Sequence, residues 1–154
     1  LKYTFLRNNW YSENYLGAVA HTVEIGTSYG AAGLGKISSA SRQDYAEAAA
    51  KVLTSEGHDH KTYELAGSTS FTLADLARDI AEVSGKAVTY QNLTAEDYRH
   101  ALLQAGVPAG LVDVIVDADI QTGKGAMYSE SKDLEHLIGH KTTPIKDQVK
   151  AILT

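Results

Sequence analysis

Hydrophobic and polar residues alternate along the chain in a pattern that predicts a strand, a polar corner and a helix at its start. The apolar run at residues 3–7 is typical of a strand, and Asn8 and Asn9 after it favour a turn. From about Ser12, apolar side chains recur at helical spacing until Gly26. We therefore expect one helix between these two residues.

The middle of the chain repeats this order of strand and helix. Ser41, Thr72 and Thr94 each stand three residues before an aspartate, which is the spacing of a capping box at the start of a helix. The first of the three helices should bury a face that includes Leu53. The predicted strands cover residues 36–40, 62–65 and 87–90, and the predicted helices run from Ser41 to Gly57, from Thr72 to Gly85 and from Thr94 to Gly106.

The last third of the chain is predicted to be mostly helical. A helical run covers residues 111–120, a shorter one covers 131–138, and Thr143 with Pro144 supplies a cap and a first-turn proline for a last helix. No repeat, low-complexity tract or linker divides residues 1–154, so we expect one unit. Strands that alternate with helices place this unit in the α/β class.

Charge and composition exclude several function classes. The 154 residues carry a net charge of −5 with both signs interspersed, so the chain has no basic face for nucleic acid. Cysteine is absent, which excludes disulfides and thiolate metal centres. No apolar run approaches the roughly 20 residues of a membrane span, and the first residues are too short for a secretory signal. We expect a cytoplasmic protein with no nucleic-acid or membrane partner.

Residues 30–36 fit the first seven positions of a phosphate-binding P-loop. The eighth position is Ile37, where such a loop needs serine or threonine to hold magnesium. The segment after it is β-like, whereas a P-loop runs into a helix whose first amides bind phosphate. We interpret this stretch as a glycine-rich connection.

Two other spacings have a possible chemical meaning. Tyr128 and Lys132 have the spacing of the tyrosine–lysine pair of short-chain dehydrogenases, but they stand at the start of a short predicted helix. Two pairs of histidines have no third ligand near them, so we predict no metal site. These pairs are His58 with His60 and His136 with His140.

The most informative cluster is the polar and aromatic run directly after the first strand. In open α/β sheets, ligands bind beyond the carboxyl ends of strands. Trp10 and Tyr11 could stack on a flat ring while Asn8 or Asn9 donates to its carbonyl group, as a quinone or nicotinamide pocket requires. The residues alone leave a second interpretation equally open, in which this run forms a helix cap and core aromatics.

The same run begins a wider resemblance. Residues 4–14 resemble a segment of bacterial NAD(P)H:quinone oxidoreductases of the NmrA-like group, which are atypical short-chain dehydrogenases, and triphenylmethane reductases look similar. The order and spacing of the matching segments, which together cover nearly the whole chain, carry the resemblance. The further segments are residues 35–40, 44–46, 63–67, 84–86, 88–93, 105–108 and 137–140.

The resemblance implies a Rossmann-like N-terminal domain and a smaller C-terminal lobe that closes over the nicotinamide. The chain starts at Leu1 in the middle of an expected fold, so we expect its C-terminal portion, with the last Rossmann strands and most of the substrate lobe. The glycine-rich turn for the pyrophosphate is missing, so NADPH or NADH would be bound mainly by an absent N-terminal half. A quinone-like substrate is the expected small-molecule partner, and a homodimer is compatible with this interpretation.

By the resemblance, Asn8, Asn9, Trp10 and Tyr11 match the segment that lines the nicotinamide and substrate cleft. None of them is assigned a proton transfer, because the cofactor performs the redox chemistry and the protein positions the ring. Asp44 also lies in a resembling segment, but its capping box explains it.

The sequence therefore predicts an NAD(P)H-dependent reductase of quinones or similar conjugated electrophiles, as a fragment that is inactive alone. Its rival is a non-catalytic redox sensor of the NmrA-like kind that binds the dinucleotide without turnover. A third interpretation is a scaffold domain whose pocket is vestigial.

Overall fold

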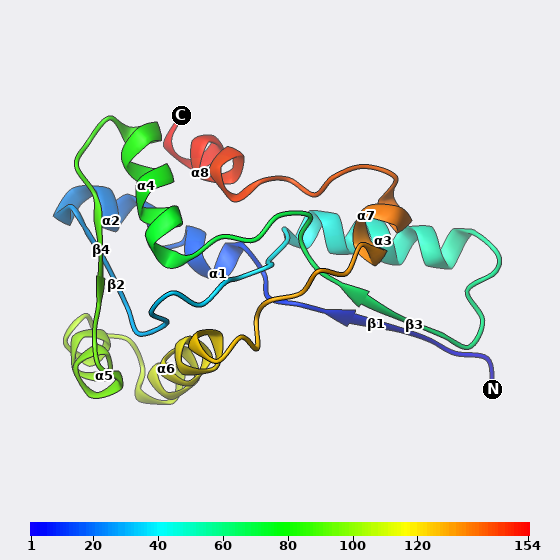
Figure 1. The fold of residues 1–154 in the computed structure, drawn as a ribbon, viewed down its shortest axis with the longest axis horizontal. Coiled ribbons are helices and arrows are strands. Elements are labelled where there is room, and N and C mark those ends of the chain that lie inside the picture. Colours follow the sequence, from blue (N-terminus) through cyan, green and yellow to red (C-terminus); the bar gives the residue numbers. More distant parts are fainter.

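The computed structural model describes residues 1–154 and divides them between two lobes with separate hydrophobic cores (Figure 1). The strand lobe contains β1 (Thr4–Asn8), α3 (Arg42–Thr54), β3 (Lys61–Leu65) and α7 (Asp133–Ile138). The helical lobe contains α1 (Glu13–Leu16), α2 (Val19–Ile25), β2 (Thr27–Gly30), α4 (Leu73–Ser84), β4 (Thr89–Asn92), α5 (Ala95–Gln104), α6 (Ala109–Gly123) and α8 (Ile145–Leu153).

The strand lobe is built on two parallel strands. β1 pairs with β3 from Thr4 opposite Lys61 to Asn8 opposite Leu65, which brings their carboxyl ends to one edge. The helices α3 and α7 pack together beside the sheet. The predicted strands at 3–7 and 62–65 are confirmed to within one residue at each end. The buried core of the lobe consists of Ala40, Tyr45, Ala48, Leu65 and Leu134.

The helical lobe holds the larger core. Its second pair of parallel strands, β2 and β4, lies against α4, which in turn packs on α8 (Figure 1). Ile80 and Val149 are nearly completely buried between these helices. The hairpin of α5 and α6 lies at the bottom of this lobe in Figure 1, with α8 at the top, and α5 itself buries no residue.

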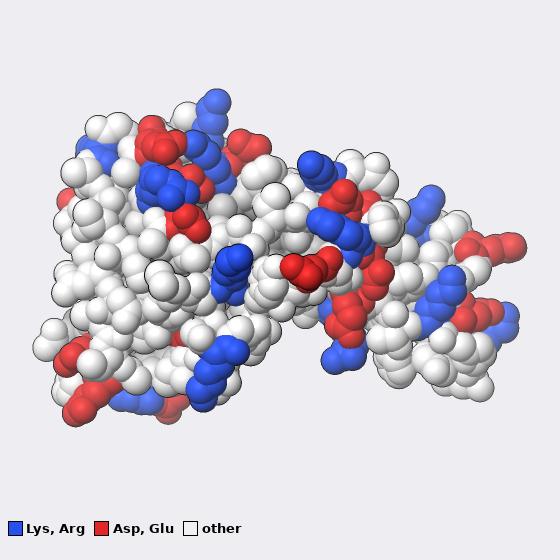
Figure 2. Space-filling model, viewed as in Figure 1, with Lys and Arg blue, Asp and Glu red and all other residues white.

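Loops with hydroxyl and amide side chains connect the lobes at a waist. Ser68 and Thr142 exchange two hydrogen bonds of 2.9 Å, each hydroxyl accepting the other residue's amide. The hydroxyls of Ser12 and Ser39 lie 3.0 Å apart and are buried. The waist is therefore held by directional polar contacts. On the face shown in Figure 2, acidic and basic groups lie close to one another over both lobes, as the sequence predicts.

The capping predictions are confirmed where the signal is local. Ser41 and Thr72 begin α3 and α4 with complete capping boxes, each bonding reciprocally with the aspartate three residues on. The Thr94 hydroxyl accepts the Asp97 amide at 3.1 Å and begins α5. Pro144, predicted within the first turn, instead occupies the N-cap of α8.

The prediction of one helix between Ser12 and Gly26 is wrong. The structure has two helices, α1 and α2, with a break at Gly17 and Ala18. The Ala18 amide donates to the Tyr15 carbonyl at 3.3 Å, a contact three residues back that interrupts the regular helical ladder. Glycine weakens a helix at this position.

The predicted strand at 36–40 is also wrong, and a strand that was not predicted, β2, lies at Thr27–Gly30. Ile37 exchanges two hydrogen bonds with Phe71, the Ser38 amide donates to Met127, and Ala40 bridges to Tyr11. Because each residue pairs with a different segment, no continuous ladder forms. The strand expected at 87–90 lies at Thr89–Asn92, and Leu53, expected in the core, is 85% exposed.

Candidate functional site

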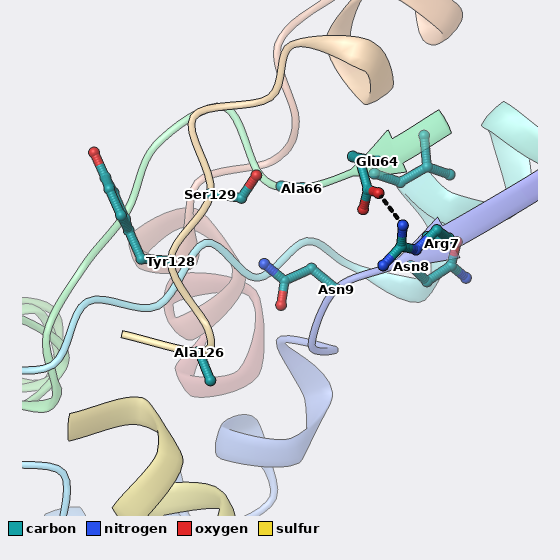
Figure 3. A pocket seen from close by; sticks show the side chains of 9 residues that line it. Arg7, Asn8, Asn9, Glu64, Ala66, Ala126, Tyr128 and Ser129 are labelled. Carbon is teal, nitrogen blue, oxygen red and sulfur yellow. Dashed lines mark ion pairs between the residues drawn. The ribbon is translucent and has the colours of Figure 1, made fainter. Parts of the chain in front are cut away.

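A cavity of about 370 Å³ opens at the carboxyl ends of β1 and β3 (Figure 3). Its position is the one where parallel α/β sheets bind ligands. The end of β1 and the end of β3 form one wall, and the segment after α6 forms the other. The cavity is lined by Arg7, Asn8, Asn9, Glu64, Leu65, Ala66, Ala126, Tyr128 and Ser129.

Asn9 connects the two walls of the cavity by hydrogen bonds. Its amide donates to the Leu65 carbonyl at 2.9 Å, which continues the β1–β3 pairing by one residue. Its side-chain oxygen accepts the Trp10 amide at 2.8 Å, and its side-chain nitrogen donates to the Met127 carbonyl at 3.2 Å. The carboxamide of Asn9 therefore bonds on both sides, while the Asn8 side chain is exposed.

The remaining polar groups give the cavity a mixed charge. Arg7 and Glu64 are register partners on the two strands and form an ion pair of 2.6 Å. Both side chains are more than half exposed, so this pair contributes little to stability. Ser38 holds the opposite wall, because its hydroxyl donates to the Ser129 carbonyl and accepts the Ser129 amide, both at 3.0 Å.

Trp10 and Tyr11 do not line this cavity. The Tyr11 ring meets the Tyr45 ring edge-on, with centroids 5.4 Å apart, and packs against the core of the strand lobe. The Tyr45 hydroxyl donates to the Trp10 carbonyl at 3.3 Å. Burial raises the pKa of Tyr45, so this phenol stays protonated. Of the four predicted residues the structure brings Asn8 and Asn9 to the cavity, and it places Tyr11 as a core aromatic.

Sequence reasoning missed most of the cavity lining. Residues 63–67 belong to the resemblance but carry no motif of their own, and the sequence links Tyr128 only to Lys132. Parallel pairing of β1 with β3 places Glu64 beside Arg7, and this pairing is not visible in the local sequence. The missed lining residues are Arg7, Glu64, Leu65, Ala66, Ala126, Tyr128 and Ser129.

The structure does not assemble Tyr128 and Lys132 into a catalytic pair. The Tyr128 hydroxyl donates to Glu130 at 2.7 Å, and this hydrogen bond raises the pKa of Tyr128. The Lys132 ammonium donates to the Ser68 carbonyl at 3.2 Å. A proton donor of this kind needs a lowered pKa, so the arrangement does not support the role.

The glycine-rich loop after β2 does not fit a pyrophosphate. The Ala31 amide donates to the Asp119 carboxylate at 2.7 Å, and the Gly33 amide donates to the Asn92 side chain at 2.8 Å. These amides are therefore already bonded, one of them to a carboxylate that disfavours phosphate. No helix begins directly at the end of the loop, since α3 starts only at Arg42, which supports the interpretation of the loop as a connection.

His58, His140 and Asp44 have local structural partners. His58 lies between the hydroxyls of Ser55 and Tyr63, at 2.9 and 2.7 Å, and His140 contacts the Glu47 carboxylate at 3.1 Å. No three histidine or acidic side chains come together in a way that could hold a metal ion. The Asp44 carboxylate accepts hydrogen bonds from Ser41 and from the Thr143 amide, and the Asp44 amide donates to the Ser41 hydroxyl, consistent with its predicted cap. None of the helices is both long and apolar enough to cross a membrane.

Comparison with known proteins relates this fold to reductases. Quinone oxidoreductase 2 of Escherichia coli is 50% identical over 147 residues, which make up 96% of this chain and 51% of that protein. No protein-family model matches the chain. The sequence therefore aligns with about half of a longer reductase.

Solved structures give the same extent of similarity. The NADPH-dependent quinone oxidoreductase QOR2 of E. coli, in complex with NADPH, matches 100% of this chain and 54% of its own, with a TM-score of 0.97 and 48% identity. The triphenylmethane reductase of Citrobacter sp. in complex with NADP(H) matches 99% of this chain and 54% of its own, with a TM-score of 0.96 and 37% identity. The α/β prediction is confirmed, since the chain has the fold of part of these proteins. The chain spans about half the length of the relatives it matches.

Proposed function

We propose, from the premise that this chain is homologous to NmrA-type quinone oxidoreductases and to triphenylmethane reductase over about half of their length, that it is the substrate-binding portion of an NAD(P)H-dependent reductase. Its substrates are quinones or similar conjugated electrophiles. The observation that carries the proposal is the cavity at the carboxyl ends of β1 and β3, with the Asn9 carboxamide joining its two walls.

The cavity has the features that a flat carbonyl compound requires. Its volume of about 370 Å³ is within the usual range for small-molecule sites. Asn8 is free to donate to a ring carbonyl, and Arg7 adds a cation nearby. In this proposal the residues at the cavity bind and orient the ring, and Asn8 and Asn9 transfer no proton.

In this proposal the dinucleotide is bound mainly by the half of the reductase that this chain does not match. The relatives' structures contain NADPH or NADP(H), and a dinucleotide supplies hydride when it is bound. The glycine-rich loop of this chain does not fit the phosphates, because Asp119 and Asn92 already bond its amides. We assign the pyrophosphate to the part of the relatives that the chain does not match, and the 154 residues to the C-terminal portion.

One observation favours a non-catalytic redox sensor as the second candidate. The only phenol at the cavity, Tyr128, has a raised pKa and donates to Glu130, so the cavity contains no activated proton donor. A sensor would bind the ring and dinucleotide without turnover. A chimera that joins this chain to the unmatched part of E. coli quinone oxidoreductase 2 separates the two functions. Quinone-dependent oxidation of NADPH is expected for the reductase, and binding without oxidation for the sensor.

The binding proposal is tested directly on the 154-residue chain. Titration with 1,4-naphthoquinone, followed by Trp10 fluorescence and amide chemical shifts, should show saturable binding with shifts at residues 7–9 and 64–66. Asn8→Ala removes the exposed amide that is proposed to donate to the ring carbonyl, so its affinity should fall about fivefold, the value of one hydrogen bond. Asn14→Ala, an exposed amide outside the cavity, should bind like the unmodified chain. Equal affinity for all three proteins would contradict the proposed cavity.

A further inference from the structure

A second hollow of about 450 Å³ adjoins the candidate site and shares Tyr128 with it. It lies between the loop at residues 34–36 and the segment at 123–125, directly after α6. No acidic side chain lines it. The Tyr128 ring, 41% exposed, forms the partition between the two hollows, on the side of the first cavity away from Arg7 and Glu64 (Figure 3).

Glycines allow the two backbone segments that border this hollow to pack closely. A Cβ atom on Gly35 would lie 2.3 Å from the Thr122 carbonyl oxygen, and one on Gly123 would lie 3.3 Å from the Ala32 carbonyl oxygen. The two segments therefore touch backbone to backbone, which fixes their spacing. Gly125, with a φ of 89°, reverses the chain so that it returns past Tyr128. The result is a shallow surface formed by two closely packed backbone segments.

Two lysines face this surface without an ionic partner. Lys36 and Lys124 both line the hollow, and neither forms an ion pair with a carboxylate. The end of α6 accounts for Lys124, because a cation there complements the helix dipole. It does not account for Lys36, whose ammonium lies 5.4 Å from the centre of the Tyr128 ring. Because both lysines border one hollow that no carboxylate lines, an anion bound there would meet only positive charge.

We propose that Lys36 and Lys124 form an oxyanion subsite, which holds a sulfonate, carboxylate or phosphate group on an aromatic substrate whose ring occupies the adjoining cavity. This inference rests on the proposed function and narrows its substrates to anionic ring compounds. Tyr128 separates the two parts, so a ligand that spans them lies along its ring.

The experiment compares two probes on the 154-residue chain, 1,4-naphthoquinone-2-sulfonate and uncharged 1,4-naphthoquinone, by isothermal titration and amide chemical shifts. The sulfonate should bind about 25-fold more tightly and shift the amides of Gly35, Gly123 and Gly125. Lys36→Gln and Lys124→Gln should each lower its affinity about fivefold, the upper value for an exposed ion pair, and leave the uncharged quinone unaffected. Lys86→Gln, which removes an exposed lysine elsewhere, is the matched control.

The outcomes distinguish failure of the oxyanion subsite from failure of the proposed function. If both quinones bind with equal affinity, or if the Lys36 and Lys124 variants retain the full sulfonate preference, the oxyanion subsite is wrong while the ring cavity stands. If neither quinone binds, the proposed function fails and the subsite fails with it. High salt should abolish the preference of the unmodified chain for the sulfonate, and a preference that survives it would contradict the ionic origin.

Discussion

Asp119 is a carboxylate whose environment disfavours its charge. It is 6% exposed, and its one hydrogen bond comes from the Ala31 amide. Burial raises the pKa of Asp119 above the ordinary value, and the Ala31 bond offsets only part of this effect. A raised pKa in the folded state means that the native protein binds this proton more tightly than the unfolded chain. The contribution of Asp119 to stability is therefore largest in acid and is lost as the pH rises through the folded-state pKa.

Asp119→Asn should remove this dependence while keeping an oxygen that accepts the Ala31 amide. We expect the free energy of unfolding of the variant to match that of the unmodified chain in acid and to exceed it at neutral pH. Asp119→Ala, which loses the acceptor, should instead be destabilised by about 1–2 kcal/mol at neutral pH. Urea denaturation across a pH series measures both. A constant difference between the Asp119→Asn variant and the unmodified chain at all pH values would contradict the assigned direction of the shift.

Gly35 is required by space, since its backbone lies directly against the Thr122 carbonyl. Gly35→Ala should cost roughly 1–3 kcal/mol, because two backbone segments must separate. Gly110, within α6, has nothing within 4 Å of an added Cβ, so Gly110→Ala should stabilise the chain by about 0.4–1 kcal/mol. Thermal unfolding monitored by circular dichroism compares the two. Similar effects of both substitutions would show that crowding at Gly35 is not limiting.

At the scale of elements, the two complete capping boxes differ in whether the aspartate also bonds a distant segment. Asp75 bonds only within its own turn and to Arg78, and it is partly exposed. Asp44 is buried and also accepts the Thr143 amide at 3.2 Å, which ties α3 to the segment before α8. Asp75→Ala should cost about 1 kcal/mol and Asp44→Ala about 2–4 kcal/mol. Chemical denaturation measures both, and equal losses would mean that the Thr143 contact contributes nothing.

Elements with local signals were predictable, and elements that depend on distant partners were not. Ser41 and Thr72 begin helices because their partners lie three residues away, so the sequence alone contains the whole interaction. Residues 36–40 have β-like composition, but their backbone partners lie at three separate places in the chain. The candidate site shows the same division. Asn8 and Asn9 follow a predictable strand, whereas the wall around Tyr128 depends on how the segment after α6 folds back.

At the scale of the whole molecule, a substitution in one hydrophobic core should destabilise mainly the lobe that contains it. Leu134 is fully buried in the strand lobe and Ile80 is 2% exposed in the helical lobe. Leu134→Ala and Ile80→Ala should each cost about 2–5 kcal/mol. Native-state hydrogen exchange should show faster exchange in β3, α3 and α7 for the first and in α4 and α8 for the second. Uniform acceleration across both lobes would show that the chain unfolds as one cooperative unit.

The polar contacts at the waist restrict how the two lobes can move relative to each other. Packed apolar surfaces can slide by small steps, but the hydroxyl and amide contacts of Ser12 with Ser39, and of Ser68 with Thr142, are satisfied over a narrow range of angles. These contacts therefore restrict the angle between the two lobes and act as a stiff joint. The Asn9 contact with Met127 belongs to the same joint and forms part of the candidate site. We therefore expect a ligand in this cavity to favour one angle between the two lobes, because it contacts a residue that also holds them together.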